Sequence, residues 1–187
     1  MGHRGAPADR AQLDPGTHCM SARIAAYRVD SRSSADRAAD AAMSRLRLKP
    51  GGLRDALRRA VCESADNVSD WAGSGEVSIE EDRSGRSVVI ADSGPGIHGT
   101  MRESFPDLSG TQLLLHAVQP GVTSTGEQFR GFGLWSAVQV SNYGAEVAVE
   151  SGGVAVLFRQ GGADSCSKSS STSVGTVVRI ALGQAES

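Results

Sequence analysis

A change in hydrophobic spacing midway along the chain is the feature that most constrains its fold. Within residues 53–71, apolar side chains recur every three or four positions, which is the period of a helix with one buried face. Within residues 77–91 the period becomes two, and turn residues at 82–85 divide this segment into two strands. We therefore expect a helix followed directly by a β-hairpin, with the apolar face of the helix buried against a sheet.

Weaker patterns on both sides of this unit complete the predicted architecture. They indicate a strand at 22–29, a helix at 33–48, a short helix near 112–118, a helix from 131 to about 142, and strands near 145–150, 153–160 and 174–182. Ser33 or Ser34 is expected to cap the helix at 33–48, and the serine-rich residues 164–173 are expected to form a solvated hairpin loop. Together these elements predict an α+β fold, a two-layer sandwich with helices on one face of a mixed, mostly antiparallel sheet.

Chain length and local composition predict one domain behind a flexible leader. The chain has 187 residues, which is the size of one compact domain. Residues 1–20 mix Gly, Pro, Asp and Arg without an apolar period, so we expect them to be flexible and the domain to span residues 21–183. The segment 97–130 is a long connection, and connections of that length are commonly functional or disordered.

Composition argues against several classes of function. A net charge of -2 with 21% charged residues argues against a basic nucleic-acid binder. No stretch approaches the ~18 apolar residues of a membrane span, and the first residues lack the apolar segment of a signal peptide, so we expect a cytoplasmic protein without a membrane partner. Cys19, Cys62 and Cys166 are odd in number and widely spaced, which argues against a disulfide framework and a zinc site.

Two polar side chains lie one turn apart on the helix predicted at 53–71. Glu63 and Asn67 are separated by four residues and therefore project from the same side of the helix. A carboxylate can deprotonate or orient a nucleophile, and a neutral amide oxygen can ligate Mg²⁺ without adding charge that repels a phosphate. The alternative is a solvated polar face on which Arg59 and Glu63 form an ordinary ion pair.

An aspartate ends the second strand of the predicted hairpin. Asp92 is followed by a glycine-rich run that includes Gly94, Gly96 and Ile97. Glycines allow the backbone to approach a flat ring closely, and the carboxylate could accept a hydrogen bond from an exocyclic amino group such as that of adenine. An ordinary turn that begins at an aspartate explains the same residues.

A second glycine-rich segment lies at the start of the helix predicted from residue 131. It contains Thr123, Arg130, Gly131, Gly133 and Leu134. Backbone N–H groups at the start of a helix form an anion site when glycine leaves them uncovered, and an arginine adds a planar set of donors, so phosphates would fit here. A glycine-rich turn before a helix is the alternative.

The order and spacing of these three motifs resemble the histidine-kinase-like ATPase superfamily, which includes gyrase, Hsp90, MutL, sensor histidine kinases and anti-sigma serine kinases. The resemblance covers about residues 22–182. Residues 63–70 resemble the N box of the family, with the E-x-x-D-N-x-x-D pattern of the gyrase type, and residues 92–96 resemble the first glycine box. This resemblance implies a Bergerat fold that binds ATP and Mg²⁺.

The resemblance also implies roles for individual residues. It makes Glu63 the catalytic carboxylate, Asn67 the magnesium ligand and Asp92 the residue that reads the adenine amino group. The remaining family elements are the ATP lid at 97–130, the second glycine box at 131–134, and Thr176, whose hydroxyl supports the adenine pocket.

The sequence thus favours a regulatory protein that binds Mg·ATP and either hydrolyses it or transfers its γ-phosphoryl group to a protein. The chain resembles a stand-alone anti-sigma serine kinase, which implies a phosphorylatable regulator or a sigma-like factor as partner, and family members often form homodimers. The alternative is a nucleotide-gated interaction module that binds ATP or ADP with little turnover. The absence of lysine from residues 97–130, where gyrase-type members have one for the γ-phosphate, favours this alternative. A third possibility is a degenerate member that binds no nucleotide.

Overall fold

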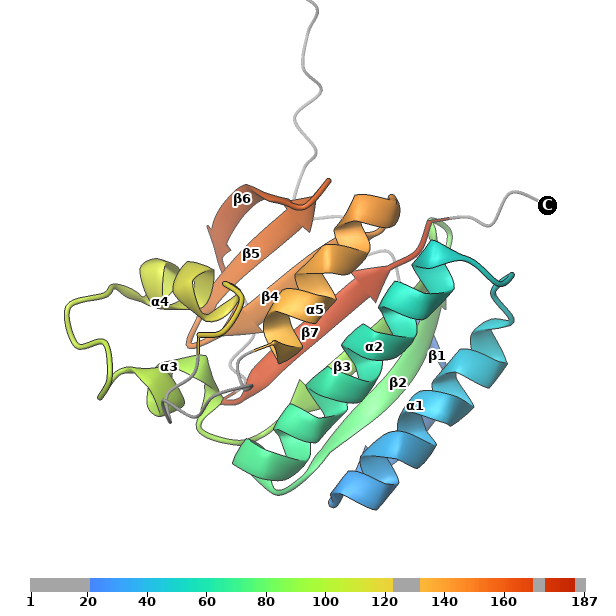
Figure 1. Ribbon diagram of the computed structural model, residues 1–187, viewed down its shortest axis with the longest axis horizontal. Coiled ribbons are helices and arrows are strands. Elements are labelled where there is room, and N and C mark those ends of the chain that lie inside the picture. Colours follow the sequence, from blue (N-terminus) through green and yellow to red (C-terminus); the bar gives the residue numbers. More distant parts are fainter. Residues whose placement is uncertain (1–20, 123–131, 170–173, 184–187) are drawn as a thin grey trace, which may run out of the picture.

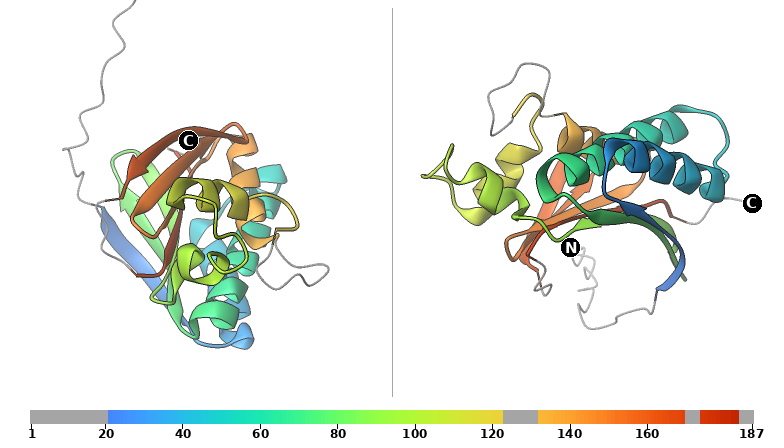
Figure 2. Two further views of the ribbon diagram at one scale, coloured as in Figure 1. Left: turned by 90° about the vertical axis from the view of Figure 1, so that its left-hand side faces the viewer. Right: turned by 90° about the horizontal axis from the view of Figure 1, so that it is seen from below.

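A computed structural model describes residues 21–122, 132–169 and 174–183, and these form two layers. One layer is a seven-stranded sheet, and helices cover one face of it (Figures 1 and 2). The strands are β1 (Ala22–Val29), β2 (Gly75–Asp82), β3 (Gly85–Asp92), β4 (Glu146–Ser151), β5 (Val154–Arg159), β6 (Gly162–Lys168) and β7 (Thr176–Ala181). The helical elements are α1 (Arg32–Leu46), α2 (Gly52–Asn67), the π-helical turn η1 (Val68–Ala72), α3 (Gly96–Met101), α4 (Gly110–Ala117), α5 (Gly133–Gln139) and the 3-10 turn η2 (Val140–Tyr143).

The sheet runs in the order β1-β2-β3-β7-β4-β5-β6, and each neighbouring pair is antiparallel. The predicted α+β two-layer sandwich is confirmed, but the described strands contain no parallel pair, so the sheet is not mixed. The reason is that β3 and β4 run in the same direction while β7 lies between them. This insertion brings the start of β7 beside the end of β3, where Val177 pairs with Ala91.

Helix α1 begins earlier than predicted, and its cap is Ser31 rather than Ser33 or Ser34. The Ser31 hydroxyl accepts a hydrogen bond from the Ser34 backbone N–H (3.3 Å), and the Ser34 hydroxyl accepts one from the Ser31 N–H (2.9 Å). This reciprocal pair satisfies N–H groups that the start of a helix leaves without partners. All three serines carry the same capping signal, so the sequence alone could not choose among them.

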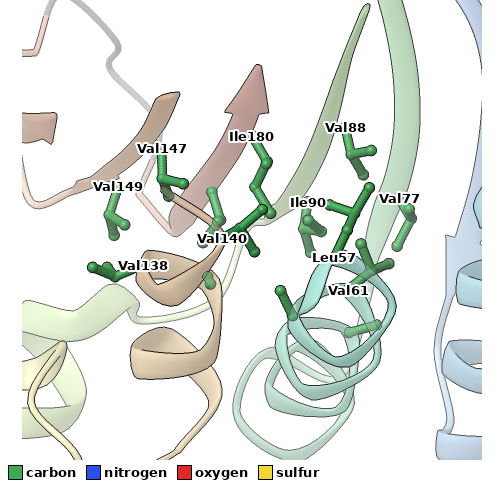
Figure 3. Close-up of a cluster of buried hydrophobic side chains, with 14 of the residues drawn as sticks. Leu57, Val61, Val77, Val88, Ile90, Val138, Val140, Val147, Val149 and Ile180 are labelled. Atoms are coloured by element: carbon green, nitrogen blue, oxygen red, sulfur yellow. The ribbon is translucent and has the colours of Figure 1, made fainter. Parts of the chain in front are cut away.

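The core lies between the helices and the covered face of the sheet. Leu57 and Val61 of α2 point toward Val88 and Ile90 of β3 (Figure 3). A second part of this cluster, farther along the sheet, consists of Val138, Val140, Val147, Val149 and Ile180 (Figure 3). These contacts hold α2 and α5 side by side on one face of the sheet (Figure 1). Among the described helices, none combines the length and the apolar character needed to cross a bilayer.

Two segments differ from the elements predicted for them. Residues 164–173 were expected to form a loop, but Gly162–Lys168 is strand β6, paired with β5, and residues 170–173 lie outside the described residues. Every residue of β6 is exposed, so the strand lacks the alternating apolar signal that identifies strands. Helix α3 was not predicted, because its six residues are too few to display a helical period.

Replacing Leu57 by Ala should destabilise the fold by about 2–5 kcal/mol, because truncating a fully buried leucine leaves a cavity between α2 and the sheet. Urea unfolding followed by circular dichroism should show a lower midpoint with an unchanged slope. Val174→Ala is the matched control: Val174 is 72% exposed, so its truncation should change the free energy of unfolding by less than about 0.5 kcal/mol. Equal losses in the two variants would contradict this placement of α2.

Candidate functional site

A cavity of about 300 Å³ lies between the two layers, at the carboxyl end of β3. This volume falls at the lower end of the range of about 300–1,000 Å³ that small-molecule sites occupy. Its walls come from α2, the end of β3, the start of β7, α3 and the start of α5. The predicted site residues that line it are Glu63, Asn67, Asp92, Gly96, Ile97, Gly133, Leu134 and Thr176.

The other four predicted residues are not among the described residues that line the cavity. Gly94 supports a lining residue, since its backbone N–H donates a hydrogen bond of 2.8 Å to Asp92 Oδ1. Thr123, Arg130 and Gly131 lie outside the described residues. The structure therefore brings together the motif on α2, the motif after β3 and the start of α5, which are far apart in the sequence.

The wall formed by α2 carries the predicted carboxylate and amide. The apolar stripe of α2 faces the sheet, and Glu63 and Asn67 lie at the edge of this stripe, facing the cavity. The Asn67 amide is held directly against Gly133, the first residue of α5: a Cβ atom added to Gly133 would lie 3.0 Å from Asn67 Cγ and still closer to its amide nitrogen. Only glycine allows this approach, so a larger residue at position 133 would displace the amide.

The wall formed by β3 carries a partly buried carboxylate. Burial is the main cause that raises the pKa of Asp92 above its ordinary value, because it disfavours the charged form. Hydrogen bonds from the backbone N–H groups of Gly94 and Thr176 act in the opposite direction and lower the pKa, but they offset the effect of burial only in part. The carboxylate is thus fixed in place at the end of β3, and it is incompletely solvated.

A buried serine that the sequence analysis did not single out connects two walls of the cavity, α3 and the start of β7. Ser151, at the end of β4, accepts a hydrogen bond from the Ile97 N–H (2.9 Å) and donates one to the Gly175 carbonyl (3.2 Å). Gly96 has a positive φ of 67°, and a Cβ atom there would lie 2.6 Å from Ser151 Oγ. The first turn of α3 therefore packs directly against the end of β4 and the start of β7. In the sequence Ser151 only ends an alternating strand, so no signal marks it.

At the rim of the cavity, an ion pair joins α1 to η1. Arg32, from the start of α1, lines the cavity and donates to both carboxylate oxygens of Asp70, with distances of 3.3 and 2.9 Å. Asp66 also lines the cavity, and burial raises its pKa, as does the nearby carboxylate of Asp36, whereas Arg32 lowers it. The sequence analysis missed Arg32, because the contact joins residues on different elements and no motif contains both.

The cavity also combines apolar and aromatic surface with its polar groups. Ile90 and Val178 contribute apolar surface from the sheet, and the aromatic rings of Trp71 and Phe132 lie at the boundary with solvent, each residue being 39% exposed. A site with apolar walls and a few fixed polar groups suits a heteroaromatic ligand with polar substituents.

Among the described residues, no group of three or more His, Cys, Asp or Glu side chains is arranged to hold a metal ion. Asn67 offers one neutral oxygen ligand at the cavity wall, and Mg²⁺ commonly takes one or two protein ligands together with substrate phosphates and water. The donor set of the cavity therefore fits a magnesium ion that is carried by a phosphorylated ligand.

Comparison with protein families identifies the chain. Residues 52–186 match the family described as Histidine kinase-, DNA gyrase B-, and HSP90-like ATPase. The match begins at the first residue of α2 and includes every described residue that lines the cavity except Arg32. Searches of curated proteins and of solved structures gave no match. Because the family match spans well over half of the chain, this protein belongs to the histidine kinase-, DNA gyrase B- and HSP90-like ATPases, a family whose domain supports ATP binding.

Proposed function

We propose that this protein is a regulatory enzyme that binds Mg·ATP in this cavity and hydrolyses it or transfers its γ-phosphoryl group to a partner protein. The observation that carries the proposal is that Glu63, Asn67 and Asp92 line a single cavity, although they come from a helix and a strand end in different layers. Membership of the ATPase family supports nucleotide binding, and the geometry of this cavity suggests a role for each side chain.

The base of the nucleotide occupies the side of the cavity formed by the sheet. Asp92 accepts a hydrogen bond from the adenine amino group. This bond compensates for the partial desolvation of the carboxylate in the protein. Ile90 and Val178 contact the apolar faces of the ring, and Thr176 supports Asp92 through its backbone N–H. The planar base thus gains both apolar contact and one charge-assisted hydrogen bond.

The phosphates lie toward Asn67 and the start of α5. Asn67 would hold a magnesium ion through its amide oxygen, while its amide nitrogen lies against Gly133. When bound, the ion neutralises charge on the β- and γ-phosphates. The lid is proposed at residues 97–130, of which the described part, up to residue 122, includes α3 and α4.

Glu63 acts as the general base of the reaction. It lies one turn before Asn67 on the same side of α2 and is solvent-exposed at the edge of the cavity, where a water molecule or a protein hydroxyl can reach it. Transfer to a protein hydroxyl would make the chain a serine kinase of the anti-sigma type, whose partner is a phosphorylatable regulator or a sigma-like factor.

A nucleotide-gated interaction module is the second candidate function. Lysine is absent from the described residues that line the cavity, and the two lysines of the chain, Lys49 and Lys168, lie before α2 and on β6. A site without a lysine to stabilise the γ-phosphate favours binding over turnover. In that case the bound nucleotide acts by selecting one conformation of the partner-binding surface.

Asp92→Asn should raise the Kd for ATP by about tenfold to 150-fold, because a charge-assisted hydrogen bond of about 1.5–3 kcal/mol is lost. Asn keeps the oxygen that accepts from the Gly94 N–H, so the local backbone should persist. Isothermal titration calorimetry measures the change. Asp82→Asn, at the β2–β3 turn, is the matched control and should bind ATP as the wild type does. Equal affinity of Asp92→Asn and the wild type would rule out the adenine role.

The same pair of proteins tests the protonation state of Asp92. Its pKa is raised, so ATP affinity of the wild type should fall as pH drops through a window that begins above the ordinary aspartate value. The variant should lack this component, and the difference between the two profiles removes the titration of ATP itself. Without nucleotide, the free energy of unfolding should depend on pH in the opposite direction. Burial of the charged carboxylate lowers stability at pH values above the pKa of Asp92 in the folded state, and this cost is absent below its pKa in the unfolded state.

Glu63→Ala should keep ATP affinity within about threefold of wild type while slowing phosphate release or transfer by at least about 100-fold, the usual minimum contribution of a general base. Radiolabelled ATP, with and without candidate partner proteins, provides the assay. Asp55→Ala, in the first turn of the same helix and away from the cavity, should leave the rate unchanged. A wild-type protein that binds ATP but is inert with every partner would favour the interaction module instead.

Gly133→Ala should reduce the magnesium-dependent part of ATP affinity by about tenfold or more, because the new methyl group displaces the Asn67 amide. Titrations with Mg²⁺ and with EDTA separate this part from the total. Gly162→Ala is the control, since its only close neighbour would be a carbonyl oxygen at 3.9 Å. If Gly133→Ala and wild type gain equally from magnesium, Asn67 does not hold the ion.

A further inference from the structure

Ser64 is a polar residue on the buried, otherwise apolar face of α2. It is 4% exposed, and its neighbours along the buried stripe are Ala60, Val61, Ala65 and Val68. Within the described part of the chain, Ser64 Oγ is the one buried side-chain nitrogen or oxygen atom without a hydrogen-bond partner. Burying a hydroxyl without a partner costs free energy, so this exception requires a reason.

The other buried serines show that this fold normally satisfies such hydroxyls. Ser141, which is fully buried, donates to the Val138 carbonyl (2.8 Å) and accepts from the Gly161 N–H (2.8 Å). A serine inside a helix can donate to the carbonyl four residues earlier, yet Ser64 makes no such bond. The unsatisfied hydroxyl is therefore specific to this position.

The position of Ser64 points to a ligand. Ser64 lines the cavity described above, together with Asp92 and Thr176. Successive residues of a helix are rotated by about 100°, so Ser64 faces the sheet, whereas Glu63 lies at the edge of the stripe. Across the cavity from α2, the sheet contributes Ile90 and Asp92. The hydroxyl is therefore placed on the sheet-facing side of the cavity, which is the part assigned to the base.

We propose that Ser64 is a specificity-determining residue whose hydroxyl donates a hydrogen bond to a ring nitrogen of the purine. The inference rests on the proposed function. A carboxylate such as Asp92 can only accept hydrogen bonds, and a purine edge presents ring nitrogens that need a donor beside the amino group. Ser64 supplies this donor from the opposite wall. Two side chains then read the base, one as acceptor and the other as donor.

Ser64→Ala should raise the Kd for ATP by about threefold to tenfold, the usual range for loss of one hydrogen bond. The affinity for inorganic tripolyphosphate, measured by competition with ATP, should not change, because tripolyphosphate has no base. The melting temperature of the nucleotide-free variant should equal or exceed that of the wild type, because the substitution removes an unsatisfied buried hydroxyl.

Ser141→Ala is the matched control, because it removes a buried serine hydroxyl whose hydrogen bonds are satisfied and that lies outside the cavity. It should lower the melting temperature and leave ATP affinity unchanged. The two variants should therefore show opposite patterns of stability and affinity.

Three outcomes would overturn the role of Ser64. These are unchanged ATP affinity in Ser64→Ala, an equal loss of affinity for tripolyphosphate, and a loss of melting temperature like that of Ser141→Ala. In each of these cases wild-type protein still binds ATP, and the proposed function stands. A wild-type protein that binds no ATP would instead refute the proposed function, and this inference with it.

Discussion

The burial of the apolar face of α2 against the sheet is the interaction on which the rest of the structure depends. Leu57 and Val61 anchor the helix over β3, and this contact fixes its rotation about its own axis (Figure 3). Once the rotation is fixed, Glu63 and Asn67 must lie at one edge of the stripe, and Ser64 must face the sheet. A rotation of one residue, about 100°, would turn the carboxylate and the amide away from the cavity. The chemistry of the site is therefore set by packing.

The topology of the sheet completes the site. Because β7 is inserted between β3 and β4, the end of β3 meets the start of β7. Asp92 therefore accepts a hydrogen bond from the Thr176 backbone N–H. Ser151 at the end of β4 then joins the start of β7 to the first turn of α3. The cavity is thus built from strand ends that only this strand order makes adjacent. Strand pairing, more than the loops, determines where its walls lie.

The sequence predicted the parts of this arrangement that depend on regular patterns. The stripe of α2 and the alternation of β2 and β3 were sufficient to place Glu63, Asn67 and Asp92 on the correct elements. The α+β sandwich followed from the order of those elements. The position of β7 between β3 and β4, which makes each neighbouring pair antiparallel, did not follow from that order. That position is set by long-range pairing, for which the chain carries no local signal.

Other features escaped prediction because they have no period or motif. Strand β6 is exposed along its whole length and is read as a polar loop, while α3 is too short to show a helical pattern. Arg32 reaches Asp70 across two elements, so spacing in the sequence gives no indication of it. Ser64 looks like a tolerated small residue within a stripe until the absence of a hydrogen-bond partner becomes visible.

The cavity gathers polar groups that are costly in the protein alone. Asp92 is partly desolvated despite its two backbone hydrogen bonds, and the Ser64 hydroxyl has no partner among the described residues. Elsewhere buried serines such as Ser141 and Ser151 are satisfied, so these costs are concentrated in one place. A ligand that supplies a donor to Asp92 and an acceptor to Ser64 removes both costs together, and because it binds only the folded state it also stabilises the fold. The stability cost of the empty cavity and the proposed recognition of the base would thus have the same physical origin, which is the trade-off between stability and function expected of a binding site.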